Sequence, residues 1–136
     1  MNTDSRTLVL IDPSSPDGEG GLDVLEADDH AVTLLLMLHG QGASSLEEFA
    51  SAEGIDIATA GSIYLDQVAE RLDHDDVESL STSGSDAVGE ILHVVRQGTV
   101  RRVVLPASLP GLSGPSLAKL AAGSPVPIVI APRVAA

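Results

Sequence analysis

Short apolar runs alternate along the chain with amphipathic and polar segments. The runs TLVLI, AVTLLLML, VVL and VPIVIA are nearly continuous and lack the alternation of a strand with one face in water. Such runs are typical of strands covered on both faces, as in a parallel sheet with helices on each side. They predict strands at Thr7–Ile11, Ala31–Leu38, Val100–Leu105 and Val126–Ala131, with a weaker, edge-like strand at Val77–Thr82.

The spacing of apolar residues predicts helices between most of these strands. One helix follows a cap at Ser44 or Ser45 and ends at Gly54, another covers Ile57 to Leu72, a third begins at Ser85 and ends at Gly98, and a fourth covers Ser116–Ala122. The start of the second helix stays open, because the residues IDIATA also suit a short extended segment.

The segment Ser14–His30, between the first two strands, has little helical potential. It contains Gly18, Gly20 and Gly21 and many acidic residues, and only LDVL offers a short apolar face. It holds at most about two turns of helix. We therefore expect the first crossover helix to be short or missing, which would leave apolar sheet surface exposed for a partner or a second protomer to cover.

Strands that alternate with helices indicate βαβ units with right-handed crossovers. We therefore expect an α/β fold with a single open, five-stranded and mostly parallel sheet flanked by helices. The 136 residues fit one domain, 1–136, whose core covers residues 7 to 132. Ligands of such sheets bind where loops leave the carboxyl ends of the strands, which directs attention to Pro106–Pro115.

Charge and composition exclude several classes of function. The net charge is −13, from 20 acidic and 7 basic residues, and Lys119 is the single lysine. Such a surface repels nucleic acids and anionic membranes, and aromatic residues that could stack on bases make up 1% of the chain. Acidic, lysine-poor surfaces also suit a high-salt cytoplasm, so a halophilic origin is a further hypothesis.

The chain contains no cysteine, so it can form neither a disulfide nor a thiolate site. The amino-terminal residues MNTDSRTLVL lack the basic and apolar regions of a signal peptide. No apolar stretch approaches the roughly 18–20 residues that cross a bilayer. We expect a soluble, cytoplasmic protein.

Catalytic and cofactor motifs give no full match. The G-x-x-x-x-G-K-[ST] phosphate loop is absent, and after Gly18-Glu19-Gly20 the dinucleotide pattern meets Asp23 where it needs glycine. Ser113, in GLSGP, is one glycine short of the spacing of a hydrolase elbow, so a small hydrolase is a third alternative. Asp73–Asp76 is better interpreted as a solvated helix end than as a cation site. We expect no catalytic residue and no metal site.

The order and spacing of these segments resemble the universal stress protein family. The matching segments are TLVLIDPS, LLLMLHG, SLSTSGSDAVGEILHVV, RRVVLPAS and SLAKLAAGSPVPIVIAP, which together span most of Thr7–Pro132. The resemblance implies a flavodoxin-like sheet and a homodimer formed through the last strand, here Val126–Ala131. It also implies a role in stress response or regulation, with ATP bound by part of the family.

The resemblance further implies candidate nucleotide-binding residues. Asp12 matches the aspartate that follows the family's first strand, and Gly111, Gly114 and Ser116 match parts of its G-x2-G-x9-G-[ST] loop. The x9 spacer is missing, and Pro115 replaces the glycine before the closing serine, which removes a backbone donor.

We therefore interpret the chain as a non-enzymatic domain of this type, without a cofactor, that acts through dimerisation or a protein partner. The alternative is an ATP-binding protein that uses Asp12 and the Gly111–Ser116 loop.

Overall fold

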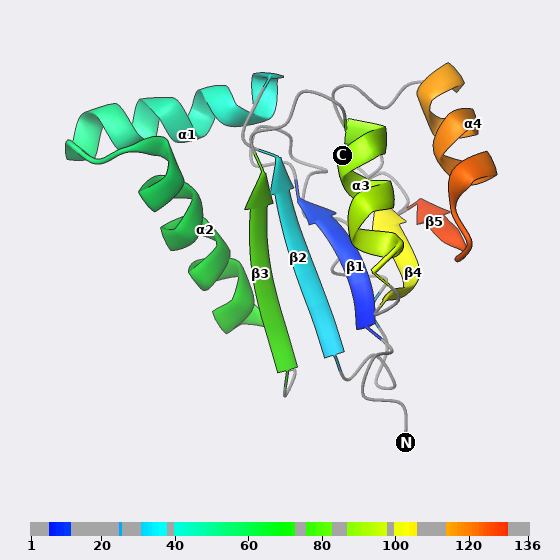
Figure 1. The fold of residues 1–136 in the computed structure, drawn as a ribbon. Helices are drawn as coiled ribbons and strands as arrows, with labels where there is room; N and C mark the ends of the chain where they lie inside the picture. Colours follow the sequence, from blue (N-terminus) through cyan, green and yellow to red (C-terminus); the bar gives the residue numbers. More distant parts are fainter. Residues whose placement is uncertain are drawn as a thin grey trace, which may run out of the picture.

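The computed structural model describes residues 6–11, 25, 31–37, 40–72, 76–82, 87–97, 100–105 and 114–130. Strands and helices follow one another along the chain (Figure 1). The elements are β1 (Arg6–Ile11), β2 (Ala31–Met37), α1 (Gly40–Glu53), α2 (Ile57–Arg71), β3 (Asp76–Thr82), α3 (Ala87–Val95), β4 (Val100–Leu105), α4 (Gly114–Gly123) and β5 (Ile128–Ile130).

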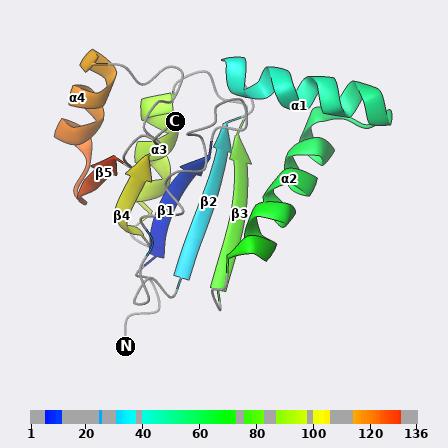
Figure 2. The ribbon, with the colours of Figure 1, turned by 180° about the vertical axis from the view of Figure 1, so that it is seen from behind.

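The five strands form one sheet in the order β3-β2-β1-β4-β5, and every neighbouring pair is parallel. The views from the two sides show β3 and β5 at opposite edges (Figures 1 and 2). This confirms the expected α/β fold and the edge position of the weak third strand. The described sheet is wholly parallel, whereas the sequence predicted a mostly parallel one.

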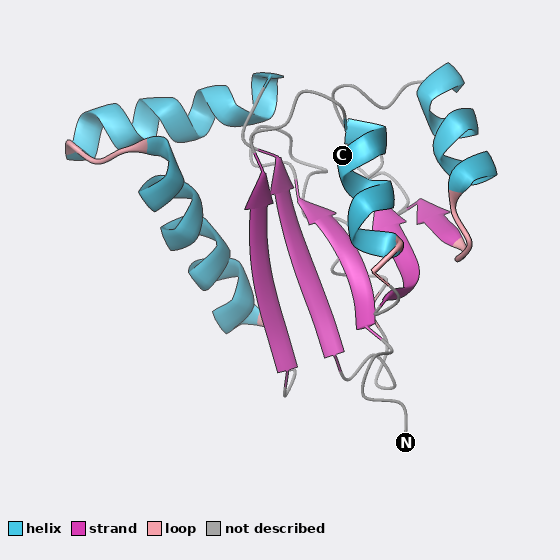
Figure 3. Ribbon diagram, in the orientation of Figure 1, coloured by secondary structure: helices cyan, strands magenta, loops and turns pink. Residues whose placement is uncertain are grey.

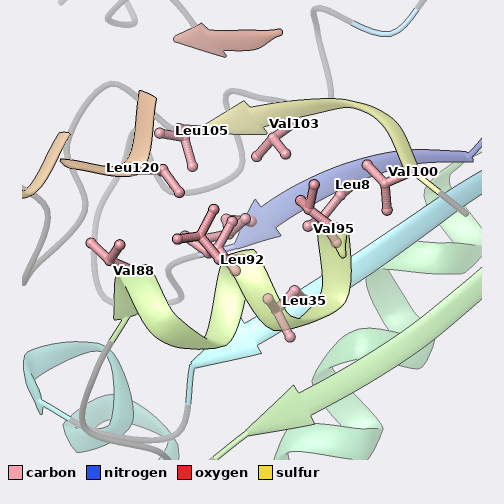
Figure 4. Packing of buried hydrophobic residues seen from close by; sticks show 11 residues of the cluster. Leu8, Leu35, Val88, Leu92, Val95, Val100, Val103, Leu105 and Leu120 are labelled. Carbon is pink, nitrogen blue, oxygen red and sulfur yellow. The ribbon is translucent and has the colours of Figure 1, made fainter. Parts of the chain in front are cut away.

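Apolar side chains cover both faces of the sheet, which explains the continuous apolar runs of its strands. On one face α3 and α4 pack against β1, β2 and β4 (Figure 4). On the other face Leu65 and Val68 of α2 and Leu46 of α1 join the second core, and Figure 3 shows both helices at the β3 side of the sheet. The first core is Leu8, Leu10, Leu35, Val88, Ile91, Leu92, Val95, Val100, Val103, Leu105 and Leu120; the second is Val9, Ile11, Val32, Leu34, Leu36, Leu46, Leu65, Val68 and Val104.

The start of α2, left open by the sequence, is fixed by a cap. The Asp56 side chain accepts a hydrogen bond from the backbone N–H of Thr59 at 2.7 Å. This is the usual way in which an aspartate satisfies a free amide of the first turn. Gly54, with φ +68°, ends α1 in a conformation that favours glycine, so the two helices form a hairpin with a short turn.

Several boundaries differ from the expected ones, and α4 covers Gly114–Gly123 where Ser116–Ala122 was expected. Helix α1 begins at Gly40, before the expected caps at Ser44 or Ser45, and β5 has three residues where Val126–Ala131 was expected. The short β5 has a local cause. The backbone N–H of Val126 donates to Ser124 Oγ at 3.2 Å, and Pro127 has no N–H, so neither residue can donate to the sheet.

The crossover between β1 and β2 lies outside the described residues except for Leu25, so its helix content stays a prediction. The expected exposure of apolar sheet surface beneath it is wrong for the residues that the structure describes. Val9, Ile11 and Val104 are fully buried, and Leu25 packs against their cluster. The crossover therefore contributes at least one apolar side chain to the cover of this face.

Candidate functional site

The carboxyl ends of β1 and β4 are the candidate ligand site. These neighbouring strands pair through Val9 and Val104. The chain leaves β1 for β2 on one side and leaves β4 for β5 on the other (Figure 1). Two strands whose connections diverge in this way form a topological switch point, where open parallel sheets bind their ligands.

The structure describes half of the residues that the sequence nominated for nucleotide binding. Asp12 comes directly after Ile11, the last residue of β1, and Gly111 comes between β4 and α4, but both lie outside the described residues. Gly114 and Ser116 belong to the first turn of α4, where Ser116 is half-buried. Two of the four candidates are therefore placed: Ser116 belongs to a helix, as expected, and Gly114 begins that helix although the sequence suggested a loop up to Pro115.

The first turn of α4 is the described part of this site that could bind an anion. Free amides at a helix start attract anions. Pro115 is exposed in this turn and supplies no N–H, and no acidic side chain occupies it. Lys119 is exposed one turn further along the helix. The turn offers a weak positive field with fewer donors than a glycine-rich loop.

Close packing fixes α4 on the sheet. Leu120 is fully buried, and Leu117 packs against the first core. At the other end of the helix, a Cβ on Gly123 would lie 3.1 Å from Leu92 Cδ1 of α3. The absence of a side chain at Gly123 therefore lets the two helices approach each other closely.

Arginine side chains lie at the opposite end of the sheet. Arg6 begins β1, and Arg101 and Arg102 follow the first residue of β4; all three are half-buried. Arg101 Nε donates to Thr7 Oγ1 at 3.5 Å. Because these residues lie at the amino ends of their strands, they cannot neutralise phosphates bound at the carboxyl ends.

Arg6 joins three strands through its guanidinium. Its Nε donates to Thr33 Oγ1, its Nη2 to the Val32 carbonyl oxygen and its Nη1 to Asp76 Oδ2, each at 2.8 Å. Glu78 Oε2 lies 3.6 Å from Nε. These contacts tie β1 to β2 and to the edge strand β3, and we call Arg6, Thr33, Asp76 and Glu78 the arginine clamp.

Hydrogen bonds lower the pKa of two carboxyl groups. The hydrogen bond from Arg6, helped by the arginine's charge, holds the pKa of Asp76 below its ordinary value of 3.8. The backbone N–H of Thr59 does the same for the pKa of Asp56 at the start of α2. Both shifts favour the ionised form, so neither carboxyl is prepared to act as a general acid near neutral pH.

The arginine clamp is not visible in the sequence alone, because its members become neighbours only when the strand order is known. The sequence of β3 does contain one indication of the clamp. Asp76 and Glu78 are two residues apart and therefore point to the same face of the strand. Two acidic residues on one face of an edge strand predict a basic side chain nearby. Arg6 is the first residue of β1, which is separated from β3 by β2.

Metal-binding and membrane-spanning features are absent from the described ranges. There, no three His, Asp or Glu side chains come together as metal ligands would. Asp76 bonds Arg6, while Asp73, His74 and Asp75 lie outside those ranges, as does Ser113. None of the described helices is long and apolar enough to cross a membrane.

Solved structures show the same arrangement of elements. The hypothetical protein MJ0577 superposes with a TM-score of 0.61 at 15% identity, over 98% of this chain and 99% of that one. A universal stress protein from Archaeoglobus fulgidus gives 0.57 at 16% identity, over 94% and 93%. A protein of the universal stress protein family from Burkholderia pseudomallei gives 0.58 at 15% identity, over 98% and 99%.

No protein-family model and no curated protein sequence matches the chain. At 15–16% identity the solved structures establish the fold and nothing finer. The chain has the five-stranded, flavodoxin-like fold of the universal stress proteins, as its sequence led us to expect.

Proposed function

We propose that this chain is a non-enzymatic, universal-stress-protein-like domain that acts in stress response or regulation by associating with other protein chains. The association that we favour is a homodimer formed through the β5 edge, within the expected Val126–Ala131 segment. No cofactor is required for this role, and the cytoplasmic location expected from the sequence stays part of the proposal.

The exposure of β5 is the observation that carries this proposal. Ile130 is 51% exposed, the largest value among the exposed large apolar side chains of the described residues. It ends the last strand in the sheet order, so the outer edge of β5 has no neighbouring strand in the described sheet. An apolar edge strand of this kind invites pairing with another chain.

A two-fold dimer would cover the exposed β5 edge of both copies with a single contact. In a two-fold contact the same strand meets itself, so the backbone groups and apolar side chains of both copies are covered at once. Ile128 and Val129 are half-buried and would add to the apolar contact. The described part of β5 carries no charge, so the high net charge of the chain does not act directly at this contact.

Sedimentation velocity at micromolar concentration tests the dimer. We expect the wild-type protein to sediment as a dimer and Ile130→Lys to sediment as a monomer, since each lysine would bring a charge into the apolar contact. Ile63→Lys is the matched control, because Ile63 is 37% exposed but lies on α2, away from β5. A wild-type monomer, or a dimer that Ile63→Lys disrupts and Ile130→Lys does not, would contradict the proposal.

A nucleotide-binding role is the second candidate, and the switch point between β1 and β4 favours it. In the sequence Asp12 comes directly after β1 and the Gly111–Ser116 segment comes after β4, and these two strands are neighbours in the sheet. Against this candidate stand Pro115, the missing spacer and the placement of three arginines at the other end of the sheet.

Nucleotide released on denaturation of the purified protein, measured by absorbance at 260 nm, separates the two candidates. We expect less than about one-tenth of an equivalent, because Lys119 alone gives the described part of this site little positive charge to bind phosphates. A full equivalent of nucleotide would favour the second candidate.

A further inference from the structure

The open edge of β5 presents the backbone groups of alternate residues. In a sheet, every second residue of a strand directs its N–H and C=O at the same neighbouring strand. The Pro127 carbonyl oxygen accepts a hydrogen bond from the backbone N–H of Val103 in β4, and Val103 pairs with Ile128. The Pro127 carbonyl and the backbone groups of Val129 therefore point at β4. Those of Ile128 and Ile130 point at the outer edge, where the described sheet has no further strand (Figure 1).

The side chains show that this alternation extends back to Val126. Val126 and Ile128 pack against the first core, whereas Val129 packs against the second core on the other face of the sheet. Side chains two residues apart in an extended segment share a face. Val126 is thus the preceding residue in the series of Ile128 and Ile130, although it lies outside the three residues of β5.

The hydroxyl of Ser124 bonds both backbone groups of Val126. Ser124 Oγ donates to the Val126 carbonyl oxygen at 2.8 Å and accepts from the Val126 N–H at 3.2 Å. These are the groups through which an extended Val126 would pair with a strand beyond the edge. Serine hydroxyls that bond the nearby backbone compete with strand pairing in this way. In the described part of this edge, Ser124 therefore leaves Ile128 and Ile130 to pair with another chain.

Two registers of a two-fold antiparallel contact use this edge. Edge-facing residues that lie opposite each other exchange two hydrogen bonds. With the axis at Ile128, that residue meets its own copy and Ile130 meets Val126, whose groups are already bonded, so one pair forms. With the axis at Val129, Ile128 meets Ile130 twice by symmetry, so two pairs form. Axes nearer the chain end place Ile128 or Ile130 opposite Pro132, which has no N–H.

We propose that Ser124 sets the register of the β5 homodimer, with the two-fold axis at Val129. Ile128 of each copy then lies opposite Ile130 of the other. This inference rests on the homodimer proposed above and adds the residue that determines its geometry. The register also suits the apolar side chains. Ile130 shares a face with Ile128 and is 51% exposed, so it would cover the half-buried Ile128 of the second copy.

Disulfide cross-linking reads the register directly, because the chain contains no cysteine of its own. With the axis at Val129, the two copies of Val129 form a non-hydrogen-bonded pair whose Cα atoms are about 4.5 Å apart, within the range that a disulfide bridges. The two copies of Ile128 are then diagonal neighbours, roughly 7–8 Å apart, which a disulfide does not bridge easily. We expect Val129→Cys to cross-link under mild oxidation at least about tenfold faster than Ile128→Cys.

Removing the hydroxyl of Ser124 should change the register. Ser124→Ala frees both backbone groups of Val126, so the axis at Ile128 becomes the register with more hydrogen bonds. We expect the ratio of Val129→Cys to Ile128→Cys cross-linking rates to fall at least about fivefold in this background. Ser124→Thr keeps the hydroxyl and should keep the ratio. Ser62→Ala, at an exposed position of α2, is the matched control, and circular dichroism checks that each variant is folded.

Sedimentation velocity and cross-linking give different results for the two proposals. A wild-type protein that stays monomeric at micromolar concentration, or a dimer that neither cysteine cross-links, would overturn the β5 homodimer and this inference with it. A dimer in which Ile128→Cys cross-links as fast as Val129→Cys would leave the homodimer standing and overturn the register. A ratio of rates that Ser124→Ala leaves unchanged, or that Ser124→Thr lowers equally, would overturn the role of the Ser124 hydroxyl.

Discussion

The arginine clamp gives a stability prediction whose size follows from its contacts. Replacing Arg6 by methionine keeps an unbranched apolar stem and removes the guanidinium, whose side chain is 11% exposed. The substitution removes the donor of two hydrogen bonds. Their acceptors are the Val32 carbonyl oxygen and Thr33 Oγ1, and the exposed fraction of Thr33 is 3%.

Each buried acceptor that loses its partner costs about 1–3 kcal/mol. The bond to Asp76 adds little to this sum, because the side chain of Asp76 is 63% exposed and water screens the pair. We therefore expect Arg6→Met to lower the free energy of unfolding by about 3 kcal/mol, counted from the two acceptors alone. With a urea m-value of about 2 kcal/mol per molar, the unfolding midpoint falls by about 1.5 M.

Urea unfolding followed by circular dichroism at constant salt measures this shift. Arg96→Met is the control, since Arg96 is exposed after α3 and its loss should cost under about 0.5 kcal/mol. Arg6→Lys keeps the charge but cannot reach all three acceptors, so its midpoint should lie between those of the wild type and Arg6→Met. A midpoint for Arg6→Met that matches that of Arg96→Met would refute the reasoning.

Two further predictions concern acid stability and the core. Because the folded pKa of Asp76 lies below its ordinary value of 3.8, the ion pair stabilises the fold above that pH, and the contribution is lost as pH falls through the lower, folded pKa. Asp76→Asn should therefore flatten the fall in unfolding midpoint below about pH 4, and an unchanged acid profile would contradict the assignment. In the first core, Ile91 is fully buried beneath α3, so Ile91→Ala should cost about 2–5 kcal/mol of unfolding free energy. The same change at the exposed Ile63 should cost under about 0.5 kcal/mol, and equal losses at the two sites would show that α3 does not pack as described.

The sheet could be predicted because burial on both faces leaves a direct mark on the sequence. Val103, Val104 and Leu105 alternate between the two cores, so the strand reads as one apolar run. The start of α2 could also have been settled, since Asp56 stands three residues before the amide of Thr59 that it caps. The length of β5 was harder to predict, because the backbone N–H of Val126 donates to Ser124 Oγ and not to the neighbouring strand.

Contacts between distant residues were beyond the reach of local patterns. Arg6 and Asp76 are far apart in the sequence and meet only across β2, which requires the strand order β3-β2-β1. The burial of Val9 and Val104 under a crossover with little helical potential was missed for a similar reason. A segment can cover a sheet with single apolar side chains, such as Leu25, without forming a helix-like pattern.

The candidate nucleotide residues stay predictions. The resemblance that named Asp12, Gly111, Gly114 and Ser116 rests on matched positions, and the structure describes Gly114 and Ser116 alone. It places these two in the first turn of α4 beside Pro115. This placement leaves both candidate functions open, and we favour association because of the exposed β5 edge.

The central claim is that the domain works by association and without a nucleotide, and a calorimetric titration of the purified protein with magnesium and ATP at high salt tests it most directly. The account predicts no saturable heat at ATP concentrations up to about 1 mM, which corresponds to a binding free energy weaker than about −4 kcal/mol. One molecule of ATP bound per chain at micromolar affinity, and lost with Asp12→Ala, would contradict it.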